Sequence, residues 1–516
     1  MSIAADASLF RSILLGLLAD IPDGAVPLAA VPVSGEQRLL VNGELSGSLD
    51  GGTFAVVDPS TGSEVGVAAD GTLADMDTAI ASARRAFDGT SWTTDAAFRA
   101  RCLRQLQDAM SDERETLRRD LVAEIGCAVR MTYGDQLDRP IEKLSFYADL
   151  AESYEYGTRL DHGVGAAGNW LYREPVGVVA AITPWNIPIE LSLAKVGAAL
   201  AAGCTVVLKP SPLSPWSATH LGRLACERTD MPAGVFNVVS SSSDAVAALL
   251  TSDPRVDAVA FTGSTTTGKR VMAAAAGSVK RVMLELGGKS ASIVLDDADL
   301  EAIVPLAAAF VCFNAGQSCI LPSRLLVPRR HLERCVGLAV DGLRAVPVGD
   351  PTDTDTFMGP LISADQLARV EGFVAEASRT GARLVTGGGR LKDREGFYFE
   401  PTLFADVDPA SPLAQDEVFG PVLSLIGYDD DDDAVAIANG TVYGLAGYVW
   451  GAETERAMAV ARRLRVGMVG VNGGSFIGAN LPFGGRGQSG IGREWGVAGF
   501  EEFLELQSVG VGALGS

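Results

Sequence analysis

Helical periodicity dominates the chain between residues 70 and 152. Apolar side chains recur there every three or four positions, with charged residues between them, most clearly in Asp75–Phe87 and Phe98–Met110. This spacing puts the apolar residues on one face of a helix. The pattern therefore predicts a set of amphipathic helices that pack on a common core.

From residue 176 the pattern changes to short, fully apolar runs that alternate with helical stretches. Strands are expected at 176–182, 204–208, 235–239 and 258–261, and helices at 191–202, 218–228, 244–251 and from about 265. Strands that are apolar on both faces and separated by helices are typical of parallel β-α-β units. We therefore predict an α/β fold with a doubly wound parallel sheet, which binds ligands beyond the carboxyl ends of its strands.

A second alternating region, with strands expected at 292–295, 325–327, 383–386, 422–426 and 468–471, follows the first. The segments 153–175 and 500–516 read instead as isolated strands. Residues 504–516 largely alternate polar and apolar and have no local partner strand, so we expect them to pair with a neighbouring subunit. The chain is thus predicted to form one α/β domain from 1–152 and 176–287, a second from 288–488, and a small β arm from 153–175 and 489–516.

Charge and composition restrict the classes of partner. The 516 residues carry a formal net charge of −22, which repels nucleic acid and anionic membranes. No apolar run approaches the roughly 20 residues of a membrane span, and Ile13–Leu18 is expected to form a short amphipathic helix rather than a secretory signal. Seven cysteines without a C-x-x-C pair favour a reducing, cytoplasmic compartment. The three histidines share no metal-ligand spacing, so no metal is expected.

One glycine-containing turn is a candidate phosphate site. The spacing G-x-G-x-x-G begins at Gly163, Gly485 and Gly510, but in no case does it both follow a buried strand and open a helix. Residues 261–269 (FTGSTTTGK) do follow the strand expected at 258–261 and open a helix, whose free N–H groups would face an anion. An ordinary capped turn explains the same residues equally well.

Two residues are candidates for covalent and acid–base chemistry. Cys319 ends a polar, glycine-containing turn, where a thiol would be exposed instead of packed in a core. Glu285 stands between leucines and two glycines, which suits a buried carboxyl group with a raised pKa that acts as a general base. A surface glutamate at the end of a strand is the alternative for Glu285.

Taken in order, seven motifs of the chain resemble those of the aldehyde dehydrogenase superfamily, and the likeness spans residues from about 40 to 508. The motifs are Pro184-Trp185-Asn186, Lys209-Pro210-Ser211, Phe261-Thr262-Gly263-Ser264, Glu285-Leu286-Gly287-Gly288-Lys289, Gly316-Gln317-Ser318-Cys319, Glu417-Val418-Phe419-Gly420-Pro421 and Pro482-Phe483-Gly484-Gly485. The resemblance implies a dinucleotide-binding domain, a catalytic domain and an oligomerisation arm, which agree with the three units above. It also implies a homodimer or homotetramer.

The same resemblance implies a catalytic set. Cys319 would add to an aldehyde carbonyl, and the side chain of Asn186 with the backbone N–H of Cys319 would hold the oxyanion. Glu285 would activate the water that hydrolyses the thioester, and Glu494 would help to relay the proton. Lys195 and Arg324 match positions that we interpret as structural.

For the cofactor, the resemblance implies contacts of Lys209 with the adenosine ribose and of Gly263 and Ser264 with the pyrophosphate. Trp185 would pack near the pyrophosphate, and Glu417 and Phe419 would contact the nicotinamide ribose and ring. Members selective for NAD usually carry a glutamate three residues after the lysine, but this chain has Pro212. NAD is therefore our first choice of cofactor, and NADP is possible.

A tunnel to Cys319 is expected to be apolar and to suit a medium-length aliphatic or an aromatic aldehyde. Its predicted lining contains no arginine, lysine or aromatic cage, and Ala194 would widen it where many relatives have an aromatic residue. Glu190 lies nearby and, turned inward, would favour a polar substrate instead. The predicted lining is Ile187, Leu191, Ala194, Ile320, Phe476 and Ile477. The alternatives are a CoA-acylating dehydrogenase, which commonly lacks the glutamate at 285, and a non-catalytic relative on the same fold.

Overall fold

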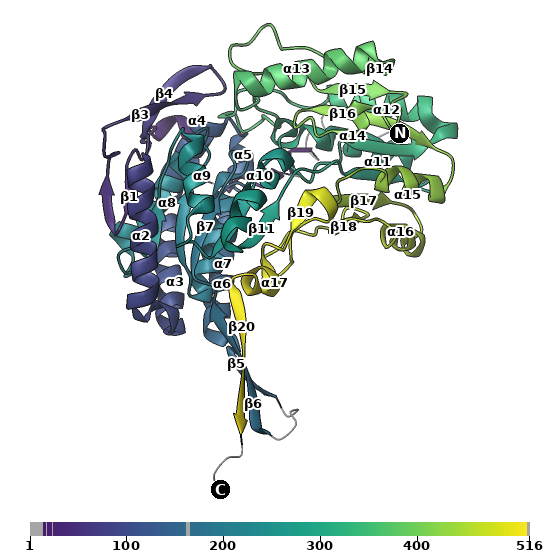
Figure 1. Cartoon of the computed structure of the whole chain (residues 1–516). Coiled ribbons are helices and arrows are strands. Elements are labelled where there is room, and N and C mark those ends of the chain that lie inside the picture. The colour runs from purple at the N-terminus through teal and green to yellow at the C-terminus, as the bar shows by residue number, and fades with distance from the viewer. Residues whose placement is uncertain (1–13, 17, 23, 161–165, 513–516) are drawn as a thin grey trace.

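The computed structural model describes residues 14–16, 18–22, 24–160 and 166–512. Two α/β bodies lie side by side, and a narrow β arm projects from the first of them (Figure 1). The predicted α/β class with a doubly wound sheet, a second α/β body and a β arm is confirmed. No helix among the described residues is long and apolar enough to cross a membrane.

The first body is built on an eight-stranded sheet in the order β19-β11-β10-β7-β8-β9-β1-β2. Strands β7 to β11 run parallel, and β1, β2 and β19 are attached antiparallel at the two edges. The strands are β1 (Leu39–Val41), β2 (Glu44–Ser46), β7 (Val178–Ile182), β8 (Thr205–Lys209), β9 (Phe236–Val238), β10 (Ala258–Thr262), β11 (Arg281–Glu285) and β19 (Gly490–Ile491). The strands predicted within 176–261 are confirmed, and β11 was not predicted.

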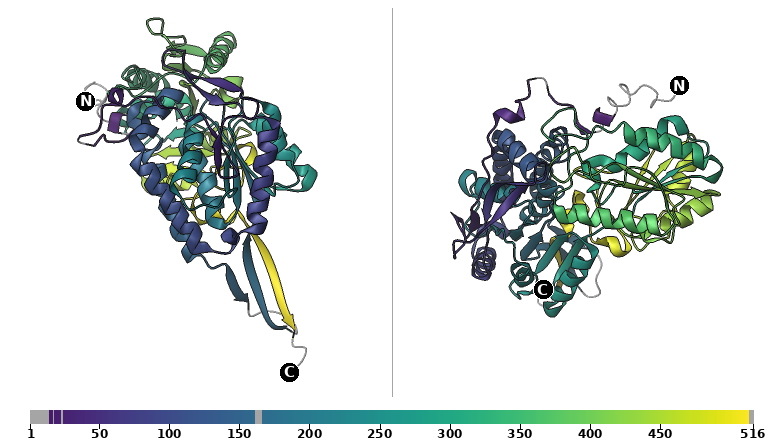
Figure 2. Two further views of the ribbon diagram at one scale, coloured as in Figure 1. Left: turned by 90° about the vertical axis from the view of Figure 1, so that its left-hand side faces the viewer. Right: turned by 90° about the horizontal axis from the view of Figure 1, so that it is seen from above.

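Helices cover both faces of this sheet (Figure 2). Helices α2, α9 and α10 pack together on one face, and α3, α7 and α8 pack together on the other, with α6 outside α3 and α7. The helices are α2 (Leu73–Gly89), α3 (Ala96–Asp112), α4 (Arg114–Ile125), α5 (Val129–Thr132), α6 (Asp138–Ser153), α7 (Pro188–Ala202), α8 (Trp216–Arg228), α9 (Asp244–Ser252), α10 (Thr265–Ala275) and α17 (Gly496–Glu501). A separate hairpin of β3 (Thr53–Asp58) and β4 (Ser63–Ala69) lies beside α4.

The second body contains a seven-stranded sheet in the order β14-β15-β16-β13-β12-β17-β18, parallel except for β14. Its strands are β12 (Ala291–Val294), β13 (Arg324–Pro328), β14 (Arg383–Thr386), β15 (Thr402–Ala405), β16 (Val422–Tyr428), β17 (Ala446–Trp450) and β18 (Met468–Val471). Its helices are α11 (Leu300–Ala309), α12 (Leu332–Arg344), α13 (Ala364–Arg379), α14 (Pro412–Gln415), α15 (Asp431–Asn439) and α16 (Thr454–Ala461). The five predicted strands are confirmed, and the sheet gains β15 and β17.

The arm is a three-stranded antiparallel sheet of β5 (Gly157–Leu160), β6 (Ala166–Pro175) and β20 (Leu504–Gly512). The prediction that residues 504–516 lack a partner strand in their own chain is wrong, because β20 pairs with β6 along its whole length. The predicted arm boundary at 489 is also too early, since β19 belongs to the first sheet and α17 packs on α7. The proposed N-terminal helix lies partly outside the described residues. Of it, Leu14–Gly16 and Leu18 are helical.

Candidate active site

The candidate residues of the first body gather at one edge of its sheet. Asn186 follows β7, Lys209 ends β8, Ser264 follows β10 and Glu285 ends β11. These four strands are neighbours and run parallel, so their carboxyl ends meet at a single edge. A ligand placed there would be reached from all four loops at once.

The loop that carries the nucleophile is held in an uncommon backbone conformation. Three consecutive residues, Asn314, Ala315 and Gly316, have φ values of 50°, 56° and 78°. A Cβ on Gly316 would lie 2.0 Å from the carbonyl carbon of Gly420, so only glycine fits there. Such strain persists where the surrounding structure over-determines it, and it fixes the turn that leads to Cys319.

Asn186 is anchored beside this loop. Its side-chain N–H donates to the backbone carbonyl oxygen of Gln317 at 3.0 Å. The backbone carbonyl oxygen of Asn186 accepts from the side chains of Gln136 and Asn314, each at 3.0 Å. A side-chain amide has two N–H hydrogens, so the second remains for a ligand near Cys319. Both Asn186 and Cys319 line the large cavity described below.

Glu285 is a buried carboxyl group, and not the surface glutamate that its sequence context also allowed. Only 4% of the residue is exposed, and neither carboxylate oxygen has a hydrogen-bond partner in the described part of the chain. Burial raises its pKa well above the usual value, the charge of Glu494 raises it further, and Lys195 opposes the shift. Burial therefore favours the neutral form of Glu285, and its carboxylate is more basic than that of an exposed glutamate once it is ionised.

Glu494 and Lys195 form a buried ion pair behind Glu285. The ammonium group of Lys195 also donates to the hydroxyl of Thr262 at 2.6 Å. Lys195, interpreted from the sequence as structural, is thus bonded directly to a candidate catalytic carboxylate. Lys195 lies on α7, and its partner Glu494 follows nearly 300 residues later, so no local sequence pattern predicts their contact.

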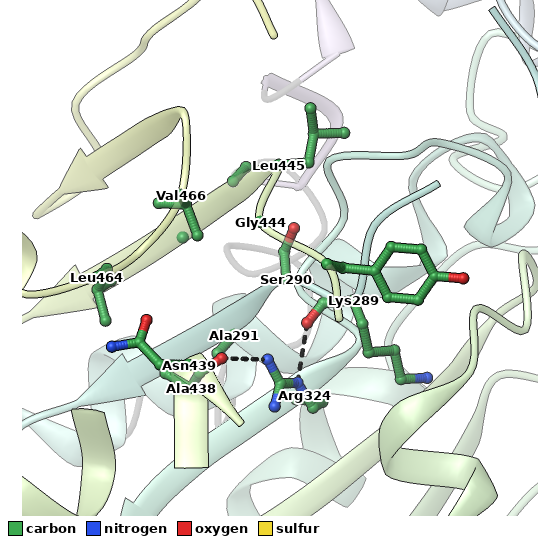
Figure 3. Close-up of a pocket in the computed structure, with 13 residues that line it drawn as sticks. Lys289, Ser290, Ala291, Arg324, Ala438, Asn439, Gly444, Leu445, Leu464 and Val466 are labelled. Atoms are coloured by element: carbon green, nitrogen blue, oxygen red, sulfur yellow. Dashed lines mark hydrogen bonds between the residues drawn. The ribbon is translucent and has the colours of Figure 1, made fainter. Parts of the chain in front are cut away.

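Arg324 does have the structural role expected of it. Its guanidinium group donates to the carbonyl oxygens of Lys289 and Ala438 at 2.9 and 2.8 Å (Figure 3). It also donates to the carbonyl oxygen of Ile437 at 2.8 Å. These bonds tie β13 to the loop before β12 and to the end of α15. The bond to Lys289 fixes the position of the segment that follows Glu285.

The Cys319 thiol rests in its protonated form. Burial raises its pKa above the usual value, and the nearby carboxylates of Glu285, Glu417 and Glu494 raise it further. A thiol is a poor nucleophile. Cys319 therefore needs a base, or a cation brought by a ligand, before it reacts.

On the cofactor side, Lys209 is buried and donates to the carbonyl oxygens of Pro210 and Ser241 at 3.0 and 2.9 Å. Burial lowers its pKa to about 8. Ser264 caps α10 by accepting from the N–H of Thr267 at 3.2 Å. A helix N-terminus with free N–H groups suits an anionic group such as a pyrophosphate, and Lys209 ends a strand at the same edge of the sheet.

Trp185, Phe419 and Glu417 come together from the two bodies. The rings of Trp185 and Phe419 meet edge to face with centroids 5.3 Å apart. Glu417 accepts from the N–H of Gly288 at 2.9 Å, and a Cβ on Gly287 would lie 2.4 Å from its carboxylate. This close approach explains why position 287 requires glycine. Burial raises the pKa of Glu417 to about 7.

A cavity of about 360 Å³ opens at Cys319. Five of the six residues predicted for the tunnel line it: Ile187, Leu191, Ile320, Phe476 and Ile477. Ala194 does not, and that prediction is wrong, because this residue is buried in the core of the first body. Aromatic residues that were not predicted also line the cavity: Phe310, Phe313, Tyr448, Trp450, Phe483 and Trp495.

The expectation that no arginine or lysine borders the cavity is also wrong. Arg139 lines it together with Asp135, and the two side chains form an ion pair at 2.9 Å. Glu190 lines it as well and is paired with Lys143. The four-residue spacing of Arg139 and Lys143 on α6 is the sequence signal that would have placed these two side chains on one face of the helix. Each charge has an opposite partner, so the lining presents no single net charge.

A thiol with an amide donor at one cavity, and buried carboxyl groups behind it, is the arrangement of an enzyme site, since a binding protein needs none of these reactive groups. The family model for the aldehyde dehydrogenase family matches residues 47–509. The chain therefore belongs to the aldehyde dehydrogenase family.

Similar proteins agree with this assignment. The 3-succinoylsemialdehyde-pyridine dehydrogenase of a Pseudomonas species is 43% identical, and the match covers 88% of this chain and 94% of the relative. Geranial dehydrogenase of Castellaniella defragrans is 38% identical, covering 92% and 98%. A mutant of aldehyde dehydrogenase C from Pseudomonas syringae, solved with NAD+ and octanal, has a TM-score of 0.89 at 40% identity, covering 93% of this chain and 98% of that one.

Proposed function

We propose that this protein oxidises an apolar aldehyde to the carboxylic acid with NAD, using Cys319 as the nucleophile. The observation that carries the proposal is the meeting of three groups at one place. Cys319 and Asn186 line the same cavity, and the loop that follows Glu285 packs against Cys319, where a Cβ on Gly288 would lie 2.3 Å from the Cys319 carbonyl oxygen.

In the first half of the reaction, the sulfur of Cys319 bonds to the aldehyde carbon as the thiol proton passes to water. The carbonyl oxygen becomes an oxyanion, which accepts from the free side-chain N–H of Asn186 and from the backbone N–H of Cys319. Asn186 is held by three hydrogen bonds before the substrate arrives. Donors fixed in advance stabilise the developing charge without reorganisation.

When bound, the nicotinamide supplies the acceptor for the hydride, and a thioester then remains on Cys319. Glu285, once ionised, removes a proton from water, and the resulting hydroxide attacks the thioester carbon. The acid is released, and the sulfur, which leaves as a thiolate, takes up the proton that Glu285 removed from water. The raised pKa of Glu285 makes its carboxylate a stronger base than an exposed glutamate.

The residues at the sheet edge fit NAD. We infer that Lys209 reaches the adenosine ribose, that Gly263 and Ser264 approach the pyrophosphate and that Trp185 packs beside it, with Glu417 and Phe419 at the nicotinamide end. NAD-bound relatives such as the octanal complex support this choice. Because Pro212 stands where NAD-selective members carry a glutamate, no carboxylate would repel a phosphate on the 2′ position of the adenosine ribose. NADP is therefore the second candidate.

The cavity favours an aldehyde with an aromatic ring or a medium-length chain. Phenylalanine, tyrosine and tryptophan side chains form much of its wall, and apolar burial adds roughly 0.8 kcal/mol per methylene. The charges of Arg139 and Glu190 are matched by Asp135 and Lys143. A free substrate carboxylate therefore finds no unpaired cation in the lining.

We also propose that the arm of β5, β6 and β20 joins subunits into a dimer or tetramer. β20 is an edge strand, and Leu506 and Val511 on it are exposed. Unpaired edge strands with exposed apolar residues are ready to pair with another chain. Removal of residues 504–516 is expected to increase the elution volume in size-exclusion chromatography, and an unchanged volume would refute the role.

The test of the proposed activity is NADH formation with aldehydes, with and without CoA. Hydrolytic oxidation predicts NADH and free acid without CoA, whereas a CoA-acylating enzyme would need CoA for turnover and a non-catalytic relative would form neither. Cys319→Ala should lose more than about a thousandfold of the rate. Cys226→Ala is the matched control, because that thiol is also half-buried and lies outside the cavity lining.

A further inference from the structure

Trp495 lines the cavity at Cys319 in a backbone conformation that bulky residues rarely adopt. Its φ and ψ angles are 59° and 166°, in a region that is otherwise occupied almost only by glycine. The neighbouring backbone holds it there. Glu494 exchanges two hydrogen bonds with Phe483 at 2.7 and 2.8 Å. The carbonyl oxygen of Trp495 accepts from the N–H of Gly499 at 2.9 Å. Glycine would fit this backbone better, so the presence of tryptophan points to a task for its ring.

The indole ring of Trp495 is fixed by two side chains of one helix. Lys143 and Tyr147 lie one turn apart on α6. The ring of Tyr147 stacks on the indole with centroids 5.4 Å apart and planes 15° apart. The ammonium group of Lys143 lies over the indole, 4.4 Å from the ring centre. Stacking and cation–π contacts both favour one placement of the ring, so the indole is a rigid part of the cavity wall.

Lys143 is held over the indole by a buried ion pair with Glu190, whose side chain also lines the cavity. The mechanism above gives no task to this pair. A buried ion pair is often no more stabilising than apolar side chains of similar size, so stability alone does not explain it. Because Glu190 fixes the ammonium group of Lys143, it also fixes the cation–π contact with Trp495.

Trp495 lies between the outer and the inner end of the cavity. The exposed fraction of the side chain is 53% at Arg139 and 13% at Glu190, and Trp495 is only 4% exposed. The residue before it, Glu494, also lines the cavity. An aldehyde whose carbonyl group reaches Cys319 therefore passes the indole ring.

We propose that Trp495 sets the width of the substrate passage, and that Lys143 and Glu190 are positioning residues that keep its ring in place. The inference rests on the proposed function and narrows the substrate to slim aldehydes, which have an unbranched chain or a single ring. A loose side chain moves aside for a wide substrate. A fixed side chain excludes a wide substrate by overlap and packs against a slim one.

Trp495→Leu tests the width directly, because it removes the ring and leaves a residue under the same backbone strain. The measurement is kcat/KM with NAD for 2-naphthaldehyde, which is wide, and for octanal, which is slim. One methylene in an apolar pocket changes kcat/KM by about 10–200-fold. We therefore expect the ratio of kcat/KM for 2-naphthaldehyde to that for octanal to rise about tenfold or more. Trp495→Phe, which keeps a smaller ring, should give a ratio between those of Trp495→Leu and the wild type.

Trp170→Leu is the matched control. Trp170 also stacks on a tyrosine, Tyr172, with centroids 6.1 Å apart and planes 10° apart. It lies on β6 in the arm and outside the cavity lining. The ratio for this variant should equal that of the wild type.

The double variant Lys143→Met/Glu190→Gln tests the positioning pair. It removes both charges, so neither is left buried without a partner, and glutamine keeps nearly the shape of the glutamate in the cavity wall. The indole is then freer to move. The ratio should rise in the same direction as in Trp495→Leu, by a smaller factor.

An unchanged or lower ratio in Trp495→Leu would overturn the proposed width limit, and if that variant does not fold, the ratio in Trp495→Phe decides. A general disturbance of Glu494 or of the fold slows both aldehydes by the same factor and so leaves the ratio unchanged. An unchanged ratio in the double variant would overturn the role of the ion pair. Failure of the proposed function gives a different result, because the wild-type protein then forms no NADH with either aldehyde.

Discussion

Gly316→Ala is predicted to displace the nucleophile without touching it. The new Cβ would lie 2.0 Å from the carbonyl carbon of Gly420, whereas ordinary contacts begin at 3.4 Å. The two loops must therefore separate by about 1.4 Å, the difference between these distances. Cys319 lies three residues further on and moves with its loop.

The size of the effect follows from two costs. An L-residue at φ 78° carries a backbone penalty of about 1–2 kcal/mol. A misplacement of about 1 Å at a reacting atom costs roughly 100-fold in rate. We expect kcat/KM to fall about 100-fold or more, together with a stability loss of a few kcal/mol at most.

Steady-state NADH formation and thermal unfolding measure the two effects. Gly372→Ala is the control, because Gly372 lies in α13 with no atom within 4 Å of the added Cβ. Alanine there should raise stability by about 0.5–1 kcal/mol and leave activity unchanged. If Gly316→Ala keeps more than about a tenth of kcat/KM, the close approach to Gly420 does not set the position of the nucleophile.

Three further predictions concern pH, substrate and cofactor. Because burial raises the pKa of Glu285, its basic form is lost as pH falls through that raised value. The acid limb of kcat should therefore lie well above 4.5, and a wild-type limb retained in Glu285→Gln would contradict the assignment. From acetaldehyde upward, each methylene should raise kcat/KM about fourfold until the cavity is full; a flat or falling series to decanal would show that the cavity has been misread. Pro212→Glu should lower the ratio of NADP to NAD use about tenfold or more by charge repulsion, and an unchanged ratio would place the 2′ group elsewhere.

The sequence predicted the parallel strands best, because their apolar runs are buried on both faces. β18 matches its predicted range of 468–471. β11 was missed because its short run, Arg281–Glu285, begins and ends on charged residues. The pairing of β20 with β6 joins segments more than 300 residues apart, and no local pattern reports such a contact.

The cavity could be predicted only in part, for a reason seen in α7. Every residue of this helix except Glu190 is buried, so its apolar pattern does not show which face borders the cavity and which borders the core. Ile187 and Leu191 border the cavity and Ala194 the core. Asn186, Cys319 and Glu285 were identified through motif resemblance, and their proximity comes from loops at the ends of separate strands.

The central claim, an acyl group carried on Cys319, is tested most directly by mass spectrometry of Glu285→Gln mixed with NAD and octanal. Slow hydrolysis in this variant should let the thioester accumulate. The intact mass should then rise by one octanoyl group, and peptide mapping should place it on Cys319 and on none of the other six cysteines. NADH formation without an adduct, or an adduct on a different cysteine, would contradict the account.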